Sequence, residues 1–520
     1  METSSPLLAR WLAGAGSPSA IHDAHGAATY DALVRSSQQV ATRLLAGSPS
    51  LEGERVALLA PPGRDFVAAF FGVLLAGGAV VVLSPLHPTA ETAYFLEDAG
   101  VRRVLVHASL GHHLPEGLRG ALDLAQVLAG APADNVALPT VHADAPALQL
   151  YTSGTTARPK GAVISHRNLG TQQDLLREAW GFAASDTLLH TLPLHHMHGL
   201  AIALLTALGA SASVRMLPFD ARATWDAMEG ATVFMAVPTM YAKLFGAFDA
   251  ASPEEQARWT RAARNLRLAT SGSAALPVTL AERWRALTGV IPLERFGMTE
   301  VGVAISNPLV GERRAGTVGS PLPTVETRIV GEHREDVETG ELWLRGPSIF
   351  LGYHQQPDAT AAAFCDGWFR TGDTVTKNED GTIRILGRSS VDILKSGGYK
   401  LSALEIEEAL REHPGVAEVA VVGVPDETWG DRVVACVVPR DELDAEVLRA
   451  FAKERLAPYK VPKEVRFFAD LPRNAIGKVQ KPLLRTQLGA PAREVESAAV
   501  EATAAPTVVR LGKRPATPGQ

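Results

Sequence analysis

The feature that most constrains this 520-residue chain is a short segment rich in hydroxyl groups that ends in cations. Residues 151–161 read Tyr-Thr-Ser-Gly-Thr-Thr-Ala-Arg-Pro-Lys-Gly. The residues before it are typical of a strand end, residues 161–164 are typical of a second strand, and a helix is predicted from His166. The loop between the strands offers backbone N–H groups, hydroxyls and the charge of Lys160, which together suit the oxygens of a polyphosphate.

This loop does not have the spacing of a Walker A motif, because G-x-x-x-x-G-K-[ST] is absent. An exposed flexible loop is the alternative interpretation of the segment, and the remaining motifs decide between the two. The length of the chain allows two or three domains. A hydrophobic content of 46% and a charged content of 20% are typical of a globular protein.

Charge and cysteine content exclude several functional classes. The net charge of −6 provides no overall basic field for nucleic acid or an anionic membrane, so we expect small-molecule partners. Cys365 and Cys436 match no metal or redox spacing and indicate a reducing compartment. The first residues, Met-Glu-Thr-Ser-Ser-Pro, lack the regions of a secretory signal, and a cytoplasmic location is expected. The sequence gives no signal for an oligomeric state.

Residues 66–83 form an uncharged stretch of 18 residues, which raises the question of a membrane span. Gly77 and Gly78 divide the stretch into a short buried helix and a β-branched strand. We therefore expect one strand–helix–strand unit of a packed sheet and no integral membrane segment.

The pattern along the chain predicts an α/β fold with a large N-terminal domain of layered sheets, a β-rich subdomain and a small mobile α+β domain. Helical and strand patterns alternate from residue 20, which favours a largely parallel sheet, and short β segments with turns replace them after about residue 310. We expect the large domain over residues 1–388, a hinge at 389–390 and the small domain over 391–489. Residues 490–520, rich in Ala, Glu, Thr and Pro, are predicted to form a disordered tail.

Three histidines, His195, His196 and His198, gather in the stretch Leu-Pro-Leu-His-His-Met-His-Gly-Leu at 192–200. A metal site, ordinary core or turn histidines, and a substrate pocket at the mouth of an apolar helix are all possible. The metal site is the weakest of the three, because no nearby Cys or carboxylate completes a ligand set.

Two further stretches suit a nucleotide base. Residues 271–276, Ser-Gly-Ser-Ala-Ala-Leu, follow a buried strand, and small residues there let a flat ring approach the backbone. Residues 294–300, Glu-Arg-Phe-Gly-Met-Thr-Glu, offer an aromatic plate in Phe296 and a carboxylate for Mg²⁺ in Glu300. A tight helix start and a charged surface turn are the respective alternatives.

Taken in this order, the motifs resemble those of the adenylate-forming superfamily of acyl-CoA synthetases, luciferases and peptide-synthetase adenylation domains. The resemblance runs from about residue 20 to 488. It is greatest to malonyl-CoA synthetases in the stretches 192–200, 233–241, 271–277 and 294–300. It implies a two-step reaction, in which a carboxylate and Mg·ATP give an acyl-AMP and pyrophosphate, and the thiol of coenzyme A then displaces AMP while the small domain turns about its hinge.

The resemblance also implies a role for individual residues. Lys478, Glu300 and His196 would act in catalysis, and Thr155 and Glu300 would hold Mg²⁺. Coenzyme A would pass Ser396, Gly397, Gly398 and Tyr399. ATP and AMP would be contacted by Thr152, Ser153, Gly154, Thr155, Thr156, Lys160, Gly272, Ser273, Ala274, Arg295, Phe296, Gly297, Met298, Thr299, Asp373 and Arg388.

Three positions depart from the pattern of the superfamily. Ala157 stands where Gly is commoner, Phe296 stands where Tyr is usual, and Ser390 stands at a hinge position that is often charged. The first change is tolerated unless the residue needs a positive φ. The second keeps the ring and loses its hydroxyl.

A dicarboxylate substrate needs a buried cation, because an unpaired buried anion is very costly. Arg295 is the main candidate, since a guanidinium binds a carboxylate with two parallel hydrogen bonds, and His198 would assist it. Arg313 or Arg314 could serve instead, and an internal salt bridge to Glu294 or Glu300 is the structural alternative. The substrate set is completed by His196, by Met197 and Val303, which would limit bulk at the α-carbon, and by Arg314.

The activity expected from the resemblance is ligation of malonate to coenzyme A with ATP, giving malonyl-CoA, AMP and pyrophosphate, with methylmalonate left open. A synthetase for short or medium monocarboxylates is one alternative, and an acyl-AMP ligase that loads a carrier protein is a second. A catalytically inert nucleotide-binding protein is a third. The glycine turn at 397–398 argues against the second, and intact Lys160, Glu300, Asp373 and Lys478 argue against the third.

Overall fold

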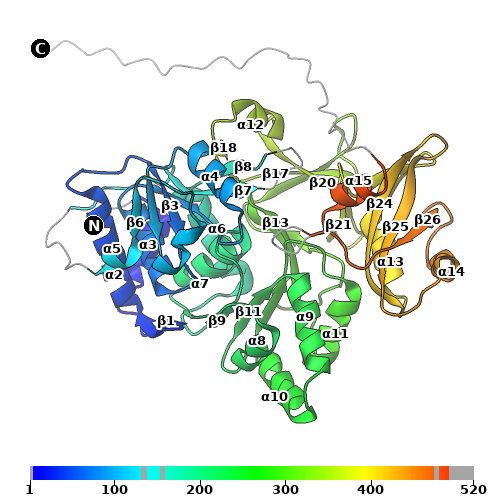
Figure 1. Ribbon diagram of the computed structural model, residues 1–520, viewed down its shortest axis with the longest axis horizontal. Helices are drawn as coiled ribbons and strands as arrows, with labels where there is room; N and C mark the ends of the chain where they lie inside the picture. Colours follow the sequence, from blue (N-terminus) through cyan, green and yellow to red (C-terminus); the bar gives the residue numbers. More distant parts are fainter. Residues whose placement is uncertain (1–3, 130–136, 153–157, 474–478, 491–520) are drawn as a thin grey trace, which may run out of the picture.

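The computed structural model describes residues 4–129, 137–152, 158–473 and 479–490 (Figure 1). It confirms the α/β class, with large sheets in the N-terminal part and a small C-terminal domain that lies at the right of the view. The described residues form four sheets. Described helices in the first part of the chain are α1 (Pro6–Ala13), α2 (Tyr30–Leu45), α3 (Arg64–Leu75), α4 (Thr89–Asp98), the 3-10 helix η1 (Ala108–His113) and α5 (Leu124–Leu128).

The first sheet carries the stems of the predicted phosphate loop. Its order is β18-β8-β7-β4-β3-β5-β6, and the strands from β7 to β6 are parallel, whereas β8 runs antiparallel between β7 and β18. Long apolar runs build the parallel part because both of its faces are covered. The strands are β3 (Arg55–Leu59), β4 (Ala79–Val82), β5 (Arg103–Val106), β6 (Ala121–Asp123), β7 (Pro146–Thr152), β8 (Lys160–Ser165) and β18 (Gly352–Tyr353).

The second sheet has nine strands in the order β15-β14-β13-β12-β11-β9-β10-β1-β2, and the strands from β13 to β1 are parallel. They are β1 (Ala20–Asp23), β2 (Gly26–Thr29), β9 (Thr187–His190), β10 (Ser213–Met216), β11 (Val233–Ala236), β12 (Leu268–Ser271), β13 (Leu293–Met298), β14 (Gly302–Ser306) and β15 (Ser320–Pro321). Its helices are α6 (His166–Trp180), η2 (His198–Leu205), α7 (Thr206–Gly209), α8 (Ala221–Ala227), α9 (Pro238–Asp249), α10 (Pro253–Arg264) and α11 (Val278–Thr288).

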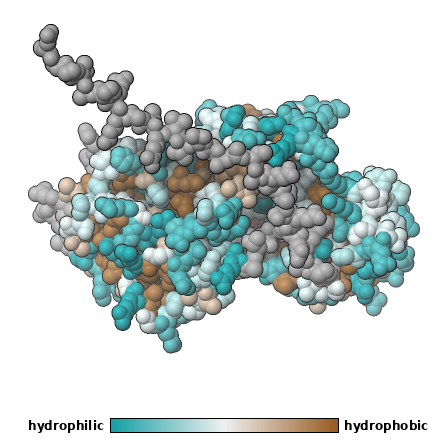
Figure 2. Space-filling model, turned by 90° about the horizontal axis from the view of Figure 1, so that it is seen from above, coloured by the Kyte–Doolittle hydropathy of each residue, from teal (hydrophilic) through white to brown (hydrophobic). Residues whose placement is uncertain are grey.

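A third, antiparallel sheet confirms the predicted β-rich region. It contains β16 (Glu326–Val330), β17 (Thr339–Arg345), β19 (Phe364–Cys365), β20 (Trp368–Lys377) and β21 (Ile383–Arg388), with α12 (Pro357–Ala363) beside it. The fourth sheet lies in the small domain, whose surface is mostly hydrophilic to neutral in Figure 2. It contains β22 (Ile393–Ser396), β23 (Tyr399–Ser402), β24 (Val416–Asp426), β25 (Gly430–Pro439) and β26 (Glu464–Phe467), with helices α13 (Ala403–Arg411), α14 (Ala445–Arg455) and α15 (Lys481–Gln487).

The uncharged stretch at 66–83 folds as predicted, into α3 and β4 with a turn at the two glycines. Phe71 of α3 stacks on Trp11 with ring centroids 4.0 Å apart, so the stretch forms part of a packed core. In the described ranges, no helix combines the length and the apolar character that a bilayer crossing needs.

The predicted apolar helix after the histidines begins differently from expectation. Residues 198–205 form a π-helix, which continues into the short α7. Its side chains are all buried, and π-helical turns occur frequently at functional sites. The ring of His190 lies 2.8 Å from the carbonyl oxygen of Gly199, which holds the first turn against β9.

Close packing of α2 on α3 generates the first prediction. A Cβ added at Gly72 would lie 2.5 Å from Cγ1 of Val40 and 3.0 Å from the carbonyl oxygen of Ser37. We expect Gly72→Ala to lower the free energy of unfolding by about 2 kcal/mol, because one of the helices must move. A Cβ added at Gly246 of α9 would meet nothing within 4 Å. We therefore expect Gly246→Ala to raise the free energy of unfolding by up to about 1 kcal/mol, because alanine favours a helix more than glycine does. Urea unfolding checks both, and equal effects would contradict the packing argument.

Candidate active site

The stems of the predicted phosphate loop are the paired ends of β7 and β8. Thr152 is opposite Lys160 in the ladder, and its hydroxyl donates to the Lys160 carbonyl at 3.4 Å. Ser153, Gly154, Thr155 and Thr156, together with Ala157, lie outside the described residues, as does Lys478. Their predicted roles therefore stay predictions.

Helix α4 holds these stems from one side. The Tyr94 hydroxyl donates to the Pro159 carbonyl at 2.9 Å, and the Arg158 guanidinium lies 5.7 Å from the Tyr94 ring centroid. The Tyr151 hydroxyl donates to Oδ2 of Asp98 at 2.6 Å. Sequence patterns did not indicate this support, because α4 and the loop are more than fifty residues apart.

Lys160 and Glu300, which were predicted to bind phosphate and Mg²⁺, meet through a tyrosine. The ammonium of Lys160 lies 5.0 Å from the Tyr353 ring centroid, and the Tyr353 hydroxyl donates to Oε1 of Glu300 at 2.8 Å. Burial is the first cause that raises the pKa of Tyr353, and Glu300 raises it further. Tyr353 was missed by the sequence analysis, although it pairs with β8 through Ala162. The buried Glu300 carboxylate fits a hard cation such as Mg²⁺.

The carboxyl end of β12 lies beside the start of β13, which runs on to Met298, and this brings the two predicted base-binding stretches together. Ser271 is opposite Glu294 in this parallel pair, and ligands of open α/β sheets bind at such ends. Ser273 has φ +68, a left-handed conformation that is uncommon for serine. The ladder between β13 and β14 shifts register after Phe296, whose side chain is buried.

The guanidinium of Arg295 is buried beside this loop with no counter-charge. Only 5% of the residue is exposed, and Nε and Nη2 are both buried without a hydrogen-bond partner. No carboxylate of the described ranges lies within salt-bridge distance of it. Burial lowers its pKa to about 10, so it remains charged near neutral pH. A Cβ on Gly272 would lie 2.5 Å from its Cζ, so the guanidinium needs a glycine there.

Glu294 and Glu300 are engaged elsewhere, which excludes the internal salt bridge considered for Arg295. The Glu294 carboxylate accepts hydrogen bonds from the backbone N–H of Leu276 at 3.3 Å and of Gly316 at 3.0 Å. Burial raises the pKa of Glu294 to about 7, although these two hydrogen bonds act to lower it.

Of the predicted histidines, His198 lies close to Arg295, and His196 lies close to His198. Oγ of Ser273 lies 3.3 Å from Nδ1 of His198, and Nε2 of both His196 and His198 is buried without a partner. Burial lowers the pKa of His198, with a contribution from Arg295, and lowers that of His196 to about 4. Neutral rings leave Arg295 as the charged group of this cluster.

A further histidine, His87, lies in this group, and the sequence motifs did not identify it. Its ring centroid is 5.3 Å from that of His195, which is 4.1 Å from that of His196. Burial lowers the pKa of His195 to about 2. Across the described part of the chain, no group of three or more His, Cys, Asp or Glu side chains is placed to hold a metal ion, so the metal interpretation of the histidines finds no geometric support.

Asp373 and Arg388, predicted for ribose, are opposite each other on β20 and β21. Nε of Arg388 lies 3.2 Å from Oδ1 of Asp373, and Nη1 donates to the Thr371 carbonyl at 2.6 Å. These contacts fix a carboxylate and a cation side by side at the end of the β-rich sheet.

The four residues predicted for coenzyme A form a tight hairpin between β22 and β23. Ser396 pairs with Tyr399, and the glycines between them have φ +58 and +83, which a two-residue turn of this kind requires. Tyr399 is exposed and stacks on Tyr459 with ring centroids 4.4 Å apart.

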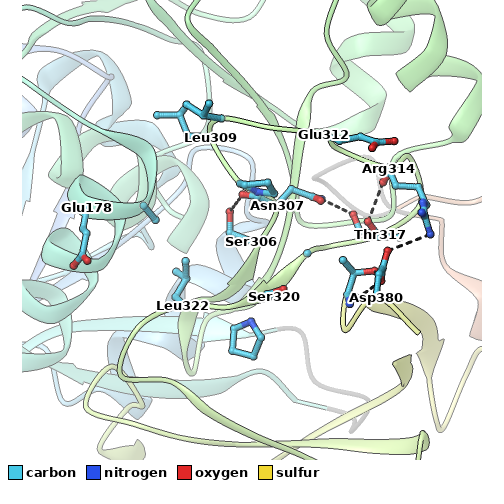
Figure 3. Close-up of a pocket in the computed structure, with 16 residues that line it drawn as sticks. Glu178, Ser306, Asn307, Leu309, Glu312, Arg314, Thr317, Ser320, Leu322 and Asp380 are labelled. Carbon is cyan, nitrogen blue, oxygen red and sulfur yellow. Dashed lines mark hydrogen bonds and ion pairs between the residues drawn. The ribbon is translucent and has the colours of Figure 1, made fainter. Parts of the chain in front are cut away.

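Arg313 and Arg314 have other partners, so the structure corrects the expectation that either could replace Arg295. Arg313 donates to three backbone carbonyls. Arg314 is exposed and pairs with Asp380, with Nη1 and Oδ2 3.2 Å apart. Arg314 lines a separate hollow of about 670 Å³ beside Ser306 and Leu322 (Figure 3).

Met197 and Val303 are both buried, as a role in limiting substrate bulk requires. Met197 directly precedes the π-helix. Val303 lies on β14 opposite Gly297 of β13, and its N–H donates to Gln172 Oε1 at 2.8 Å. Met298 is the last residue of β13, and Thr299 follows it in the turn to β14.

Comparison with known proteins assigns the family. A model described as AMP-binding enzyme matches residues 8–354, and one described as AMP-binding enzyme C-terminal domain matches residues 405–478. The chain belongs to the AMP-binding enzyme family. One curated relative of this AMP-binding enzyme is a mitochondrial malonate–CoA ligase of Bos taurus, which is 40% identical over 516 residues, covering 90% of this chain and 88% of the relative.

Solved structures of other AMP-binding enzymes share the fold. ATP-bound MatB from Rhodopseudomonas palustris has a TM-score of 0.84 at 34% identity, over 93% of this chain and 99% of that one. A malonyl-CoA ligase in a ternary product complex with methylmalonyl-CoA and AMP has a TM-score of 0.66 at 39% identity, over 90% of this chain and 100% of that one. The present structure is therefore closer in shape to the ATP-bound protein than to the product complex.

The buried carboxyl of Glu294 generates a pH prediction. Because its pKa is raised from 4.5 to about 7, the native state binds more protons than the unfolded state in this range, and stability falls as pH rises. Glu294→Gln lacks this titration. We expect the stability of the variant relative to wild type to increase by up to about 3 kcal/mol between pH 5 and 8. Urea unfolding of both proteins across this pH range checks the prediction. A difference in the free energy of unfolding that stays constant with pH would contradict the raised pKa of Glu294.

Proposed function

We propose that this AMP-binding enzyme is a malonate–CoA ligase, which joins malonate to coenzyme A with ATP through a malonyl-AMP intermediate. The observation that carries the proposal is the buried Arg295 guanidinium without a counter-charge. Leaving such a cation unpaired is costly for a protein, so its retention indicates an anionic ligand. The malonate–CoA ligase among its relatives and the structural neighbour described as a malonyl-CoA ligase support the same substrate.

Malonate fits this cation because it has one carboxylate to react and a second that must stay ionised. A planar guanidinium can donate two parallel hydrogen bonds to the second carboxylate through Nε and Nη2, the two atoms that lack partners here. The uncharged His198 ring adjoins them and can complete the anion site. A monocarboxylate would leave the Arg295 charge unpaired, so the site disfavours it.

In the first step of the proposed reaction, an oxygen of the malonate carboxylate that is not bound to Arg295 attacks the α-phosphorus of ATP. The bond from that phosphorus to the pyrophosphate oxygen breaks, and pyrophosphate leaves. Lys160 and the loop after Thr152 would bind the leaving phosphates, and Lys478 would offset the negative charge that builds as two anions meet. Bound Mg²⁺ would neutralise phosphate charge, and Glu300, positioned by Tyr353, would help to hold it.

In the second step the thiol of coenzyme A loses its proton to water and its sulfur forms a bond to the carbonyl carbon, while the bond from this carbon to the AMP oxygen breaks and AMP leaves. We propose that the small domain, from residue 391 to 489, turns about Ser389 and Ser390 and brings the hairpin of Gly397 and Gly398 to this site. The uncharged His196 would border the acyl and pantetheine paths. Asp373 and Arg388 would hold the ribose of AMP throughout.

The proposal is tested by pyrophosphate release and by mass analysis of the thioester product, with ATP, Mg²⁺ and coenzyme A. The acids are malonate, methylmalonate, succinate, sulfoacetate, propionate and butyrate. Malonate should give the highest kcat/KM, and malonyl-CoA should be the product. Higher kcat/KM with propionate or butyrate would contradict the proposal, even if an acyl-CoA forms. Activity on methylmalonate shows whether Met197 and Val303 leave room for a methyl group.

Variants of Arg295 give a sharper prediction on the same substrates. Arg295→Ala should lower kcat/KM for malonate at least a hundredfold, because a buried charged hydrogen bond contributes about 3 kcal/mol, and propionate should lose far less. Arg295→Lys should recover only part, since an ammonium lacks the planar fork. Arg314→Ala is the matched control, because its side chain is exposed and paired with Asp380. An equal loss for malonate and propionate in Arg295→Ala would point to a structural role.

A further inference from the structure

Helix α11 begins with a cap from the other domain. Its N-cap residue, Pro277, has no side-chain hydrogen bond to offer the first turn. The N–H of Val278 instead donates to Oε1 of Glu408 at 2.6 Å, and Glu408 lies 130 residues away on α13 of the small domain. A carboxylate at a helix N-terminus accepts a short, charge-assisted hydrogen bond and interacts favourably with the helix dipole.

Glu408 is held in this orientation by its own helix. Nη1 of Arg411 donates to the second carboxylate oxygen of Glu408 at 2.9 Å, and Arg411 also pairs with Glu407. The side chain of Glu408 is 24% exposed. A second pair between the domains, Lys400 with Glu332, is exposed on both sides, and such surface pairs contribute little.

The capped segment continues from the loop that adjoins Arg295. The N–H of Leu276 donates to Glu294, Pro277 has no N–H, and the N–H of Val278 donates to Glu408. The two available backbone N–H groups of residues 276–278 therefore donate to two carboxylates, one from each domain. Gly272, a few residues earlier in this loop, lies against the Arg295 guanidinium.

We infer that Glu408 is a positioning residue for the first half-reaction: when the small domain docks as in this structure, its carboxylate completes the start of α11 and fixes the loop at 272–276 against Arg295. The inference rests on the proposed function, in which the small domain turns between two steps. Turning carries α13 away from α11, so the cap is present in the docked arrangement and absent after rotation. Adenylation therefore depends on Glu408, and thioester formation does not.

The test separates the two half-reactions in Glu408→Ala and Glu408→Gln. Adenylation is followed as malonate-dependent exchange of labelled pyrophosphate into ATP. Thioester formation is followed by adding coenzyme A to enzyme that already carries the adenylate. Glu408→Ala should slow exchange about tenfold, which corresponds to one charged hydrogen bond. The rate of thioester formation should stay the same or rise. Glu408→Gln should recover part of the exchange rate, because its amide oxygen can still accept from Val278.

Glu412→Ala is the matched control, because Glu412 lies at the end of the same helix and pairs with Arg455 within the small domain. It should leave both half-reactions unchanged. Hydrogen exchange in the presence of a non-hydrolysable ATP analogue provides a readout apart from activity. Peptides that cover 276–280 should lose protection in Glu408→Ala and keep it in Glu412→Ala.

Equal slowing of both half-reactions, or unchanged exchange and unchanged protection in Glu408→Ala, would overturn the inference. Failure of the proposed function looks different. Wild type would then show no malonate-dependent exchange of pyrophosphate. The role of Glu408 could still be tested by comparing wild type and Glu408→Ala with an acid that does support exchange, and by the hydrogen-exchange protection of residues 276–280.

Discussion

A buried cation without a counter-charge sets the requirements for the rest of the site. The Arg295 guanidinium is removed from water, and desolvation of such an ion costs several kcal/mol unless a partner compensates. Among the residues that the structure describes, no internal partner does this. Glu294 is directed to backbone amides, Glu300 to Tyr353, and the adjacent His198 is uncharged. In the proposed function the substrate supplies this compensation, and the site would then select an acid with a second negative charge.

The fold creates this position at the end of a parallel sheet. Strand β12 ends at Ser271, opposite Glu294, so the small-residue loop that follows it lies beside the part of β13 that carries Arg295 and Phe296. The lack of a side chain on Gly272 lets the guanidinium lie against the loop, and the π-helix begins at His198, whose ring contacts Ser273 of the same loop. A rigid scaffold thus positions a loop that, in the proposed function, accepts both a nucleotide and an acid.

Much of this arrangement could be predicted from sequence because its signals are local. The helix that begins at His166 was predicted, and the strand ends on both sides of the phosphate loop were placed correctly, since apolar periodicity and glycine positions report backbone conformation directly. Arg295 was identified because a second carboxylate needs a cationic partner, and a guanidinium binds a carboxylate with two parallel hydrogen bonds. The uncharged run at 66–83 was resolved by two glycines.

The remaining features depend on contacts between residues far apart in the chain. Tyr353 reaches Glu300 across 53 positions, and Glu408 reaches Val278 across 130, so no local pattern contains either pair. The same limit explains Arg313 and Arg314, whose partners became visible only in three dimensions. The π-helical turn was missed because its residues fit an ordinary apolar helix equally well.

The most direct test of the account is the thermal stability of wild type and Arg295→Met, each measured alone and with malonate plus a non-hydrolysable ATP analogue. If the buried charge awaits the substrate, the variant without ligand is at least as stable as wild type, because an apolar side chain replaces an uncompensated ion. Ligand should then raise the melting temperature of wild type well above that of the variant, as mass action requires for binding to the native state alone. A variant that is strongly destabilised without ligand, yet stabilised by malonate as much as wild type, would contradict the account.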